Sequence, residues 1–286
     1  MTDKLPLTDN FLFKALFSQH VDMLTDLLNS FPEFQNEKRI VHLKVLNPEL
    51  PKATDLEKLS ILDISAEDSL GNKFIIEMQS QMESGFEKRI LFYWSQTYTK
   101  ALKKGEEYGI LPKIYSISFL DFELVKNNKV HSVFQLREKD NPEILLTEDI
   151  EFHIIELKKL KEQLANLDSD FESWLFALKN GHILEGEEMN SLVKKNPKLG
   201  KVFKEYDSYS ADPKNKSLLE ARRKSQLYLN TQVVAAKKEG IEKGIEKGEL
   251  ITALKLLDYG MPLTEVCKIT GLTEKQILEY KKSLTK

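Results

Sequence analysis

Residues 61–79 read ILDISAEDSLGNKFIIEMQ, two runs of alternating apolar and polar residues on either side of a short polar turn. Because successive side chains of a strand point to opposite faces of a sheet, this pattern predicts a β-hairpin. Ser69-Leu70-Gly71 forms a favoured three-residue loop with glycine in the left-handed position. The loop sets a register in which Asp63 lies opposite Glu77, with Cβ atoms roughly 4.5–5.5 Å apart. Gln79 follows on the same face.

Two carboxylates at this distance repel each other, and in an apolar sheet they need a compensating charge. A divalent cation such as Mg²⁺ or Mn²⁺ supplies it, because hard cations take carboxylate, water and phosphate oxygens as ligands. The bound ion can activate a water and stabilise charge on a phosphodiester, and Gln79 can orient that water. A slip of two residues would place Asp63 opposite Gln79 or Ser65 opposite Glu77, still within reach of each other. A half-exposed hairpin with a solvated polar face shows the same alternation, so the spacing alone leaves both interpretations open.

Four segments in the first 160 residues share more than this acidic pair with one group of nucleases. In chain order they are DNFLFKALF at 9–17, the hairpin with LDI and GNKFIIEMQ, RILFYWSQTY at 89–98, and the run from Gly105 through Tyr108 and Pro112 to Ile117. They resemble the recombination-promoting nucleases and putative transposases (Rpn) of the PD-(D/E)XK nuclease superfamily. The resemblance implies an α/β restriction-endonuclease-like core, in which a mixed sheet is flanked by helices. It also implies metal-dependent DNA cleavage linked to recombination or mobile elements.

The resemblance assigns roles residue by residue. Asp63 takes the place of the superfamily's metal-binding aspartate, and Glu77 that of the glutamate in its E-x-K element. Gln79 stands where the superfamily commonly has lysine, although the Rpn branch tolerates glutamine. A lysine would place the water and balance transition-state charge, so that charge has to come from another source. The candidates are a second metal ion, Lys14, Lys73 and Arg89, the last of which shares a helix face with Tyr93 one turn later.

Asp9 precedes the first predicted helix and has two interpretations. An aspartate at this position is typical of a helix N-cap, since its side chain accepts hydrogen bonds from the first free backbone N–H groups. Some superfamily members instead carry a catalytic acid on their first helix. The residues alone favour the cap, and the resemblance adds the second role.

The remaining pattern predicts an α/β core followed by helices only. Strands are expected at 40–46, 113–122, 130–136 and 152–156, and helices at 8–31, 86–104, 171–178, 187–193, 198–206 and 218–238. Ser208, Ser210, Asp212 and Pro213 mark a boundary. The expected domains are therefore a nuclease-like domain with a helical appendage at 1–212 and a helical tail at 213–286.

The tail contains two further features. Gly240, Gly244 and Gly248 recur every four residues on a charged segment, which indicates either close helix pairing in a homo-oligomer or a flexible solvated helix. The last 25 residues read as helix, turn and helix around Gly271 and Thr273. This end is interpreted either as a DNA-binding helix-turn-helix or as a helical packing module.

Composition limits the classes of protein that remain. The 286 residues are 41% apolar and 30% charged, and they contain a single cysteine, Cys267. A disulfide framework and a cysteine-based zinc site are thereby excluded. The five histidines are scattered without paired metal-ligand spacing, so the sequence argues against a zinc site. No stretch approaches the roughly 20 apolar residues that cross a bilayer. We therefore expect a soluble cytoplasmic protein without a membrane span or signal peptide.

The net charge of −3 gives no overall attraction to nucleic acid, but basic residues gather at 88–104 and 214–224. Such runs suit a phosphate-contacting surface as well as ordinary solvated helix faces. Together with the resemblance they predict a metal-dependent DNA endonuclease. The alternative is a catalytically weak or inactive relative that binds DNA or a protein partner through its helical tail, and the departure at Gln79 favours this alternative.

Overall fold

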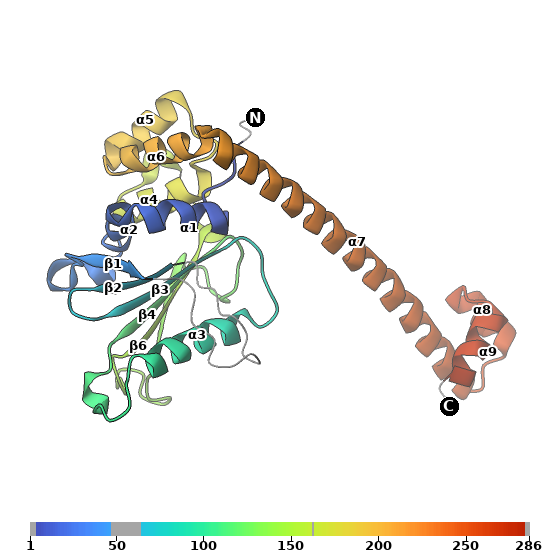
Figure 1. Cartoon of the computed structure of the whole chain (residues 1–286). Helices are drawn as coiled ribbons and strands as arrows, with labels where there is room; N and C mark the ends of the chain where they lie inside the picture. Colours follow the sequence, from blue (N-terminus) through green and yellow to red (C-terminus); the bar gives the residue numbers. More distant parts are fainter. Residues whose placement is uncertain (1–3, 47–63, 162, 284–286) are drawn as a thin grey trace. The chain divides into compact units, whose positions relative to one another are not determined.

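The computed structural model describes residues 4–46, 64–161 and 163–283 (Figure 1). Its contacts divide the chain into two units, Met1–Lys216 and Ser217–Lys286. This division lies four residues beyond the predicted boundary. No helix in the described part of the chain is long and apolar enough to cross a membrane.

The first unit is built on a mixed six-stranded sheet with the order β1-β2-β3-β4-β6-β5. Strands β3, β4 and β6 are parallel to one another, whereas β1, β2 and β5 pair in antiparallel fashion. This arrangement confirms the predicted fold class. The strands are β1 (Leu43–Leu46), β2 (Ile64–Asp68), β3 (Lys73–Gln79), β4 (Ile114–Leu120), β5 (His131–Gln135) and β6 (Ile150–Glu156).

The β2–β3 hairpin has the predicted loop and the predicted register. Ile64 pairs with Ile76, and the backbone N–H of Asp68 donates to the carbonyl of Asn72 at 3.1 Å, closing a three-residue loop. Gly71 has φ +84°, a left-handed conformation that costs glycine little. Asp68 Oδ1 accepts hydrogen bonds from two loop N–H groups at 2.9 Å. Asp63 itself lies outside the described residues, so its pairing stays a prediction.

Helices cover the two faces of this sheet differently. One face is covered by α1 (Asn10–Gln19), α2 (Val21–Leu28) and the 3₁₀ turn η1 (Pro32–Phe34). On this face the ring centre of Phe13 lies 5.9 Å from that of Phe119. Of the described helices, α3 (Phe86–Lys100) lies on the other face (Figure 1), and its Tyr93, Trp94 and Tyr98 pack on Ile75 and Ile114. Strand β4 is buried along its whole length, as expected for a parallel strand covered on both sides.

The remaining helices of the first unit extend the layer behind α1. Trp174 is fully buried and its ring lies 6.1 Å from that of Phe17. The elements are α4 (Asp170–Asn180), α5 (Gly186–Lys195) and α6 (Leu199–Ala211), with 3₁₀ turns η2 (Asn36–Lys38), η3 (Tyr108–Ile110), η4 (Leu157–Lys159) and η5 (Leu164–Asn166). These helices bury the second side of α1.

Several predicted boundaries need correction. The single helix predicted at 8–31 is wrong, because non-helical His20 ends α1 and begins α2. The helix predicted to reach residue 104 ends at Lys100, and the strand predicted at 40–46 begins at Leu43. The predicted helix at 218–238 and the glycine repeat are parts of one helix, α7 (Pro213–Asp258).

The second unit ends in a three-helix cluster. The last turns of α7, α8 (Leu263–Thr270) and α9 (Glu274–Ser283) bury Ala253, Val266, Leu272 and Ile277. Gly271, with φ +73°, ends α8. Thr273 and Gln276 exchange hydrogen bonds at the start of α9, a capping box. The predicted helix–turn–helix pattern is present and packs against α7, while its contact with DNA stays a prediction.

Candidate active site

Glu77 lies near the end of β3 on the face that α3 covers. Its neighbour Ile75 points to the same face and packs against the aromatic residues of α3. The Glu77 side chain is only 3% exposed. A carboxylate at this depth requires polar or charged neighbours, because its transfer out of water is costly.

Two of the predicted residues meet the Glu77 carboxylate. Gln79 Nε2 donates to Glu77 Oε2 at 3.4 Å, and Arg89 Nη2 lies 3.5 Å from the same oxygen. Gln79 reaches it along the strand, while Arg89 reaches it from the first turns of α3. Arg89 also pairs with Glu83, and its guanidinium lies 5.3 Å from the ring centre of Phe86. A carboxylate, an amide and a guanidinium therefore converge at this end of β3.

Ser118 adds a polar group that the sequence reasoning missed. It is the β4 partner of Glu77 in the parallel register and is fully buried. Its Oγ makes no hydrogen bond to any described residue, which is unusual for a buried hydroxyl. The sequence contains a pattern that points to Ser118, because two serines stand at alternate positions in the otherwise apolar strand IYSISFL.

Two of the predicted cations lie away from Glu77, while Tyr93 packs on the face of the sheet that carries it. Lys73 pairs with Glu67 at 2.5 Å, and four residues of strand separate it from Glu77 by roughly 13 Å. Lys14 lies on α1, which covers the opposite face of the sheet. Tyr93 packs against Ile75. Of the charge sources expected to replace a lysine at position 79, the structure therefore brings Arg89 to Glu77 and does not bring Lys73.

Asp9 is the N-cap of α1. Its Oδ1 accepts hydrogen bonds from the backbone N–H groups of Phe11 and Leu12 at 3.1 and 3.0 Å. This geometry confirms the capping interpretation, in which the carboxylate also faces the positive end of the helix dipole. A catalytic role for Asp9 stays a prediction.

The donor set suits a hard divalent cation. The Glu77 carboxylate, the amide oxygen of Gln79 and the Ser118 hydroxyl all offer oxygen, and Mg²⁺ and Mn²⁺ prefer oxygen ligands. Ser118, buried without a hydrogen-bond partner among the described residues, has the unused capacity that such a site requires. The residues present therefore fit the metal that the sequence predicts.

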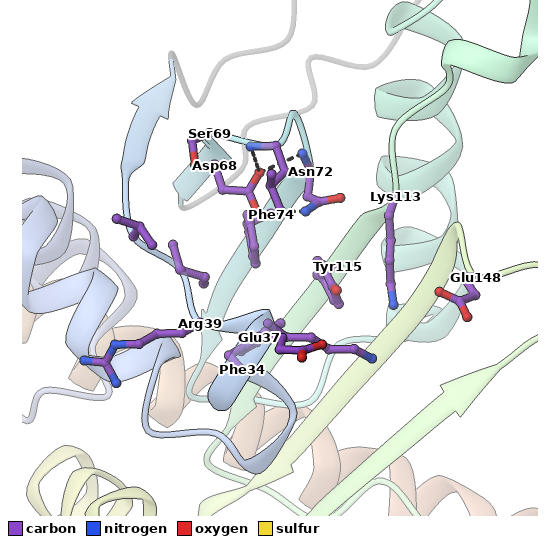
Figure 2. Close-up of a pocket in the computed structure, with 14 residues that line it drawn as sticks. Phe34, Glu37, Arg39, Asp68, Ser69, Asn72, Phe74, Lys113, Tyr115 and Glu148 are labelled. Atoms are coloured by element: carbon purple, nitrogen blue, oxygen red, sulfur yellow. Dashed lines mark hydrogen bonds between the residues drawn. The ribbon is translucent and has the colours of Figure 1, made fainter.

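A pocket of about 390 Å³ lies at the turn end of the hairpin (Figure 2). Phe34, Phe74 and Tyr115 line it, with Lys113 beside them. The Lys113 Nζ lies 4.5 Å from the centre of the Tyr115 ring. Burial lowers the pKa of Lys113, but Tyr115 and Glu151 more than offset it, so the net pKa is raised and the amine stays charged. Because Phe74 faces the α1 side, this pocket is separate from the Glu77 site.

Comparison with known protein families identifies the family of this chain. The model of the family described as PD-(D/E)XK nuclease family transposase matches residues 6–236. The match includes both strands of the hairpin and Arg89, and it extends into α7. No curated protein and no solved structure matches the chain significantly. Since the family match covers well over half of the chain and confirms the resemblance of the motifs, the protein belongs to the PD-(D/E)XK nuclease family transposases.

Proposed function

We propose that this protein is a divalent-metal-dependent DNA endonuclease that acts in recombination or on mobile elements. The proteins of its superfamily are generally nucleases, and its family carries the name transposase. The observation that supports the proposal best is the buried Glu77 carboxylate with Gln79 and Arg89 beside it. Asp63, outside the described residues, is the proposed second carboxylate.

Each residue has a defined task in this proposal. A bound Mg²⁺ or Mn²⁺ would acidify a coordinated water and neutralise charge on the scissile phosphate. Glu77 and Asp63 hold that ion through their carboxylate oxygens. Gln79 accepts a hydrogen bond from the attacking water through its amide oxygen. Arg89 supplies the positive charge that the superfamily's lysine would provide to the transition state.

A catalytically weak DNA-binding or protein-binding relative is the second candidate. The Arg89–Glu77 ion pair favours it, because a guanidinium 3.5 Å from the carboxylate already supplies part of the charge that a metal ion would. Gln79 in place of the superfamily's lysine also favours this second candidate. The two candidates differ in a single measurable property, which is metal-dependent hydrolysis.

Incubation of purified protein with supercoiled plasmid distinguishes them. We expect nicking or linearisation with Mg²⁺ or Mn²⁺ and none with EDTA. Binding of the plasmid without hydrolysis at any metal concentration would support the second candidate.

Position 79 gives a test of the charge argument. We expect Gln79→Lys to keep cleavage metal-dependent and to raise the half-saturating Mg²⁺ concentration roughly fivefold to tenfold. An added ammonium near Glu77 and Arg89 opposes a cation by about 1 kcal/mol or more. Gln79→Met, of similar length but uncharged, is the matched control. If Gln79→Lys has the same activity and metal affinity as the wild type, position 79 lies outside the site.

The helical tail is proposed to add DNA affinity and assembly. It carries the basic run at 214–224, and Leu227, Val234 and Ile241 lie exposed on α7 at seven-residue spacing, which is typical of helix pairing. A chain ending at Asp212 should keep metal-dependent cleavage at high protein concentration. It should bind DNA more weakly, with the salt slope reduced by about 0.9 per lost phosphate contact, and light scattering should show a smaller assembly.

A full-length variant separates charge from assembly. Glutamine at all five basic positions should weaken DNA binding without changing the size of the assembly; the positions are Lys214, Lys216, Arg222, Arg223 and Lys224. A shortened chain that keeps full affinity and size would leave the tail without either role. One that folds but never cleaves would place part of the active site after residue 212.

A further inference from the structure

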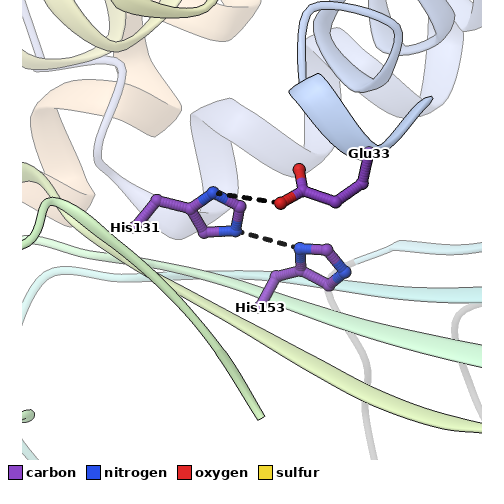
Figure 3. Close-up of side chains that lie close together, drawn as sticks. All are labelled: Glu33, His131 and His153. Carbon is purple, nitrogen blue, oxygen red and sulfur yellow. Dashed lines mark hydrogen bonds and ion pairs between the residues drawn. The ribbon is translucent and has the colours of Figure 1, made fainter. Parts of the chain in front are cut away.

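Glu33, His131 and His153 meet on the face of the sheet opposite to Glu77 (Figure 3). Glu33 lies on η1, His131 on the edge strand β5 and His153 on β6. His131 Nε2 lies 3.0 Å from His153 Nδ1, and His131 Nδ1 lies 3.9 Å from Glu33 Oε1. One ligand atom from each residue lies within 4.8 Å of the others. Histidines that are scattered in the sequence are therefore in contact in the fold.

A second carboxylate, that of Glu151, lies beside His153. His153 Nε2 lies 3.0 Å from Glu151 Oε1, and Glu151 also accepts hydrogen bonds from Gln135 at 2.8 Å and Lys113 at 3.1 Å. Because Lys113 and Gln135 both donate to Glu151, its carboxylate is the acceptor here, and His153 donates its Nε2–H to it. The other ring nitrogen of His153, Nδ1, is left to face His131 Nε2.

The two facing ring nitrogens, His131 Nε2 and His153 Nδ1, share a single proton across 3.0 Å. Glu33 Oε1 lies 3.9 Å from the other ring nitrogen of His131, Nδ1. The 3.9 Å separation is too long for a hydrogen bond, and Glu33 Oε2 is buried without a hydrogen-bond partner in the described part of the chain. A cation that replaces the shared proton would give the two facing ring nitrogens and the Glu33 carboxylate a common partner.

We propose that Glu33, His131 and His153 bind a transition-metal ion of the Zn²⁺ type, separate from the hard-cation site at Glu77. Two imidazoles and a carboxylate are a common Zn²⁺ ligand set that leaves the fourth position for water, whereas Mg²⁺ prefers oxygen alone. Ligands 2.0–2.1 Å from a tetrahedral ion lie about 3.3–3.4 Å from one another. The two ring nitrogens at 3.0 Å therefore need to separate by only a few tenths of an ångström.

The surroundings match those of known metal sites in two further ways. Glu151 stands behind His153 as the carboxylate that typically orients a metal-bound histidine. The Glu33 side chain is 31% exposed, which gives an ion a route from solvent. The ion would replace the proton that His131 shares with His153, and it would tie the edge strand β5 to the helical layer through η1.

Titration of the metal-stripped full-length protein with Co²⁺, and separately with Zn²⁺, tests the site. We expect one tightly bound equivalent of Co²⁺, the intense visible absorption of four-coordinate Co²⁺, and its loss when Zn²⁺ displaces the ion. His131→Asn and Glu33→Gln should abolish the absorption or weaken binding at least about tenfold. Glu151→Gln should weaken binding about 10- to 100-fold. Zn²⁺ should raise the Tm of the wild type more than that of these variants.

Two controls locate the ion. His42→Asn removes an exposed histidine elsewhere in the chain and should leave Co²⁺ binding unchanged. Glu77→Gln should do the same, which separates this site from the proposed nuclease metal. His153 is fully buried, so the decisive variants are the two at His131 and Glu33. The proposal is wrong if the wild type binds no Co²⁺ with this spectrum, or if folded His131→Asn and Glu33→Gln variants bind it as the wild type does.

Discussion

Glu77→Gln is expected to lower Mg²⁺-dependent plasmid cleavage by at least about a hundredfold while leaving the protein folded. The substitution keeps the size and hydrogen-bonding capacity of the side chain but removes the charge that holds the ion. Loss of one group that stabilises transition-state charge typically costs about 10²–10³ in rate. Asp63→Asn should have an effect of the same size, because the proposed site needs both carboxylates. Cleavage rates over a range of Mg²⁺ concentrations would measure this effect.

The matched control lies on the same hairpin. Glu67 is paired with Lys73 at the far end of β3, so Glu67→Gln removes one carboxylate without touching the proposed site, and we expect near wild-type cleavage. Far-ultraviolet circular dichroism should show all three variants folded. Equal cleavage by the wild type, Glu77→Gln and Asp63→Asn would trace the activity to a contaminant and refute the assignment.

The hairpin could be predicted from the sequence because its determinants are local. A loop of three residues with Gly71 at φ +84° permits one register, and the period-two alternation assigns each side chain to a face. Glu77 and Gln79 follow directly from that register. The capping role of Asp9 is local in the same way, since its partners lie two and three residues away.

Contacts between distant segments could not be predicted in this way. Arg89 was one of several candidate charges, and only the packing of α3 on the sheet brings it to Glu77. His131 and His153 are 22 residues apart and meet because β5 and β6 are antiparallel neighbours. Glu33 joins them from η1, a turn that hydrophobic periodicity does not detect. The predicted helix at 8–31 failed because apolar spacing continues across His20 although the backbone does not.

Arg89→Met is expected to lower the stability of the metal-free protein by about 1–3 kcal/mol and to increase its stabilisation by Mg²⁺. Arg89 is the cation that the described residues place within 4 Å of the buried Glu77 carboxylate. Its loss leaves Glu77 without that charge partner, and a buried polar group that loses a partner costs about 1–3 kcal/mol, more when it is charged. A less neutralised carboxylate attracts a cation more strongly. Thermal unfolding with EDTA and with increasing Mg²⁺ would measure both effects.

The second-site variant Arg89→Met/Glu77→Gln decides what the ion pair does. If Glu77 is a metal ligand, the double variant should recover part of the metal-free stability, because no uncompensated charge remains buried, and Mg²⁺ should no longer raise its Tm. Arg89→Lys keeps a cation near Glu77 and should fall between the wild type and Arg89→Met in both measurements. A protein in which Arg89 serves only as a structural partner of Glu77 would behave differently, since Arg89→Met would destabilise it without any greater response to Mg²⁺. That result would favour the inactive relative over the nuclease.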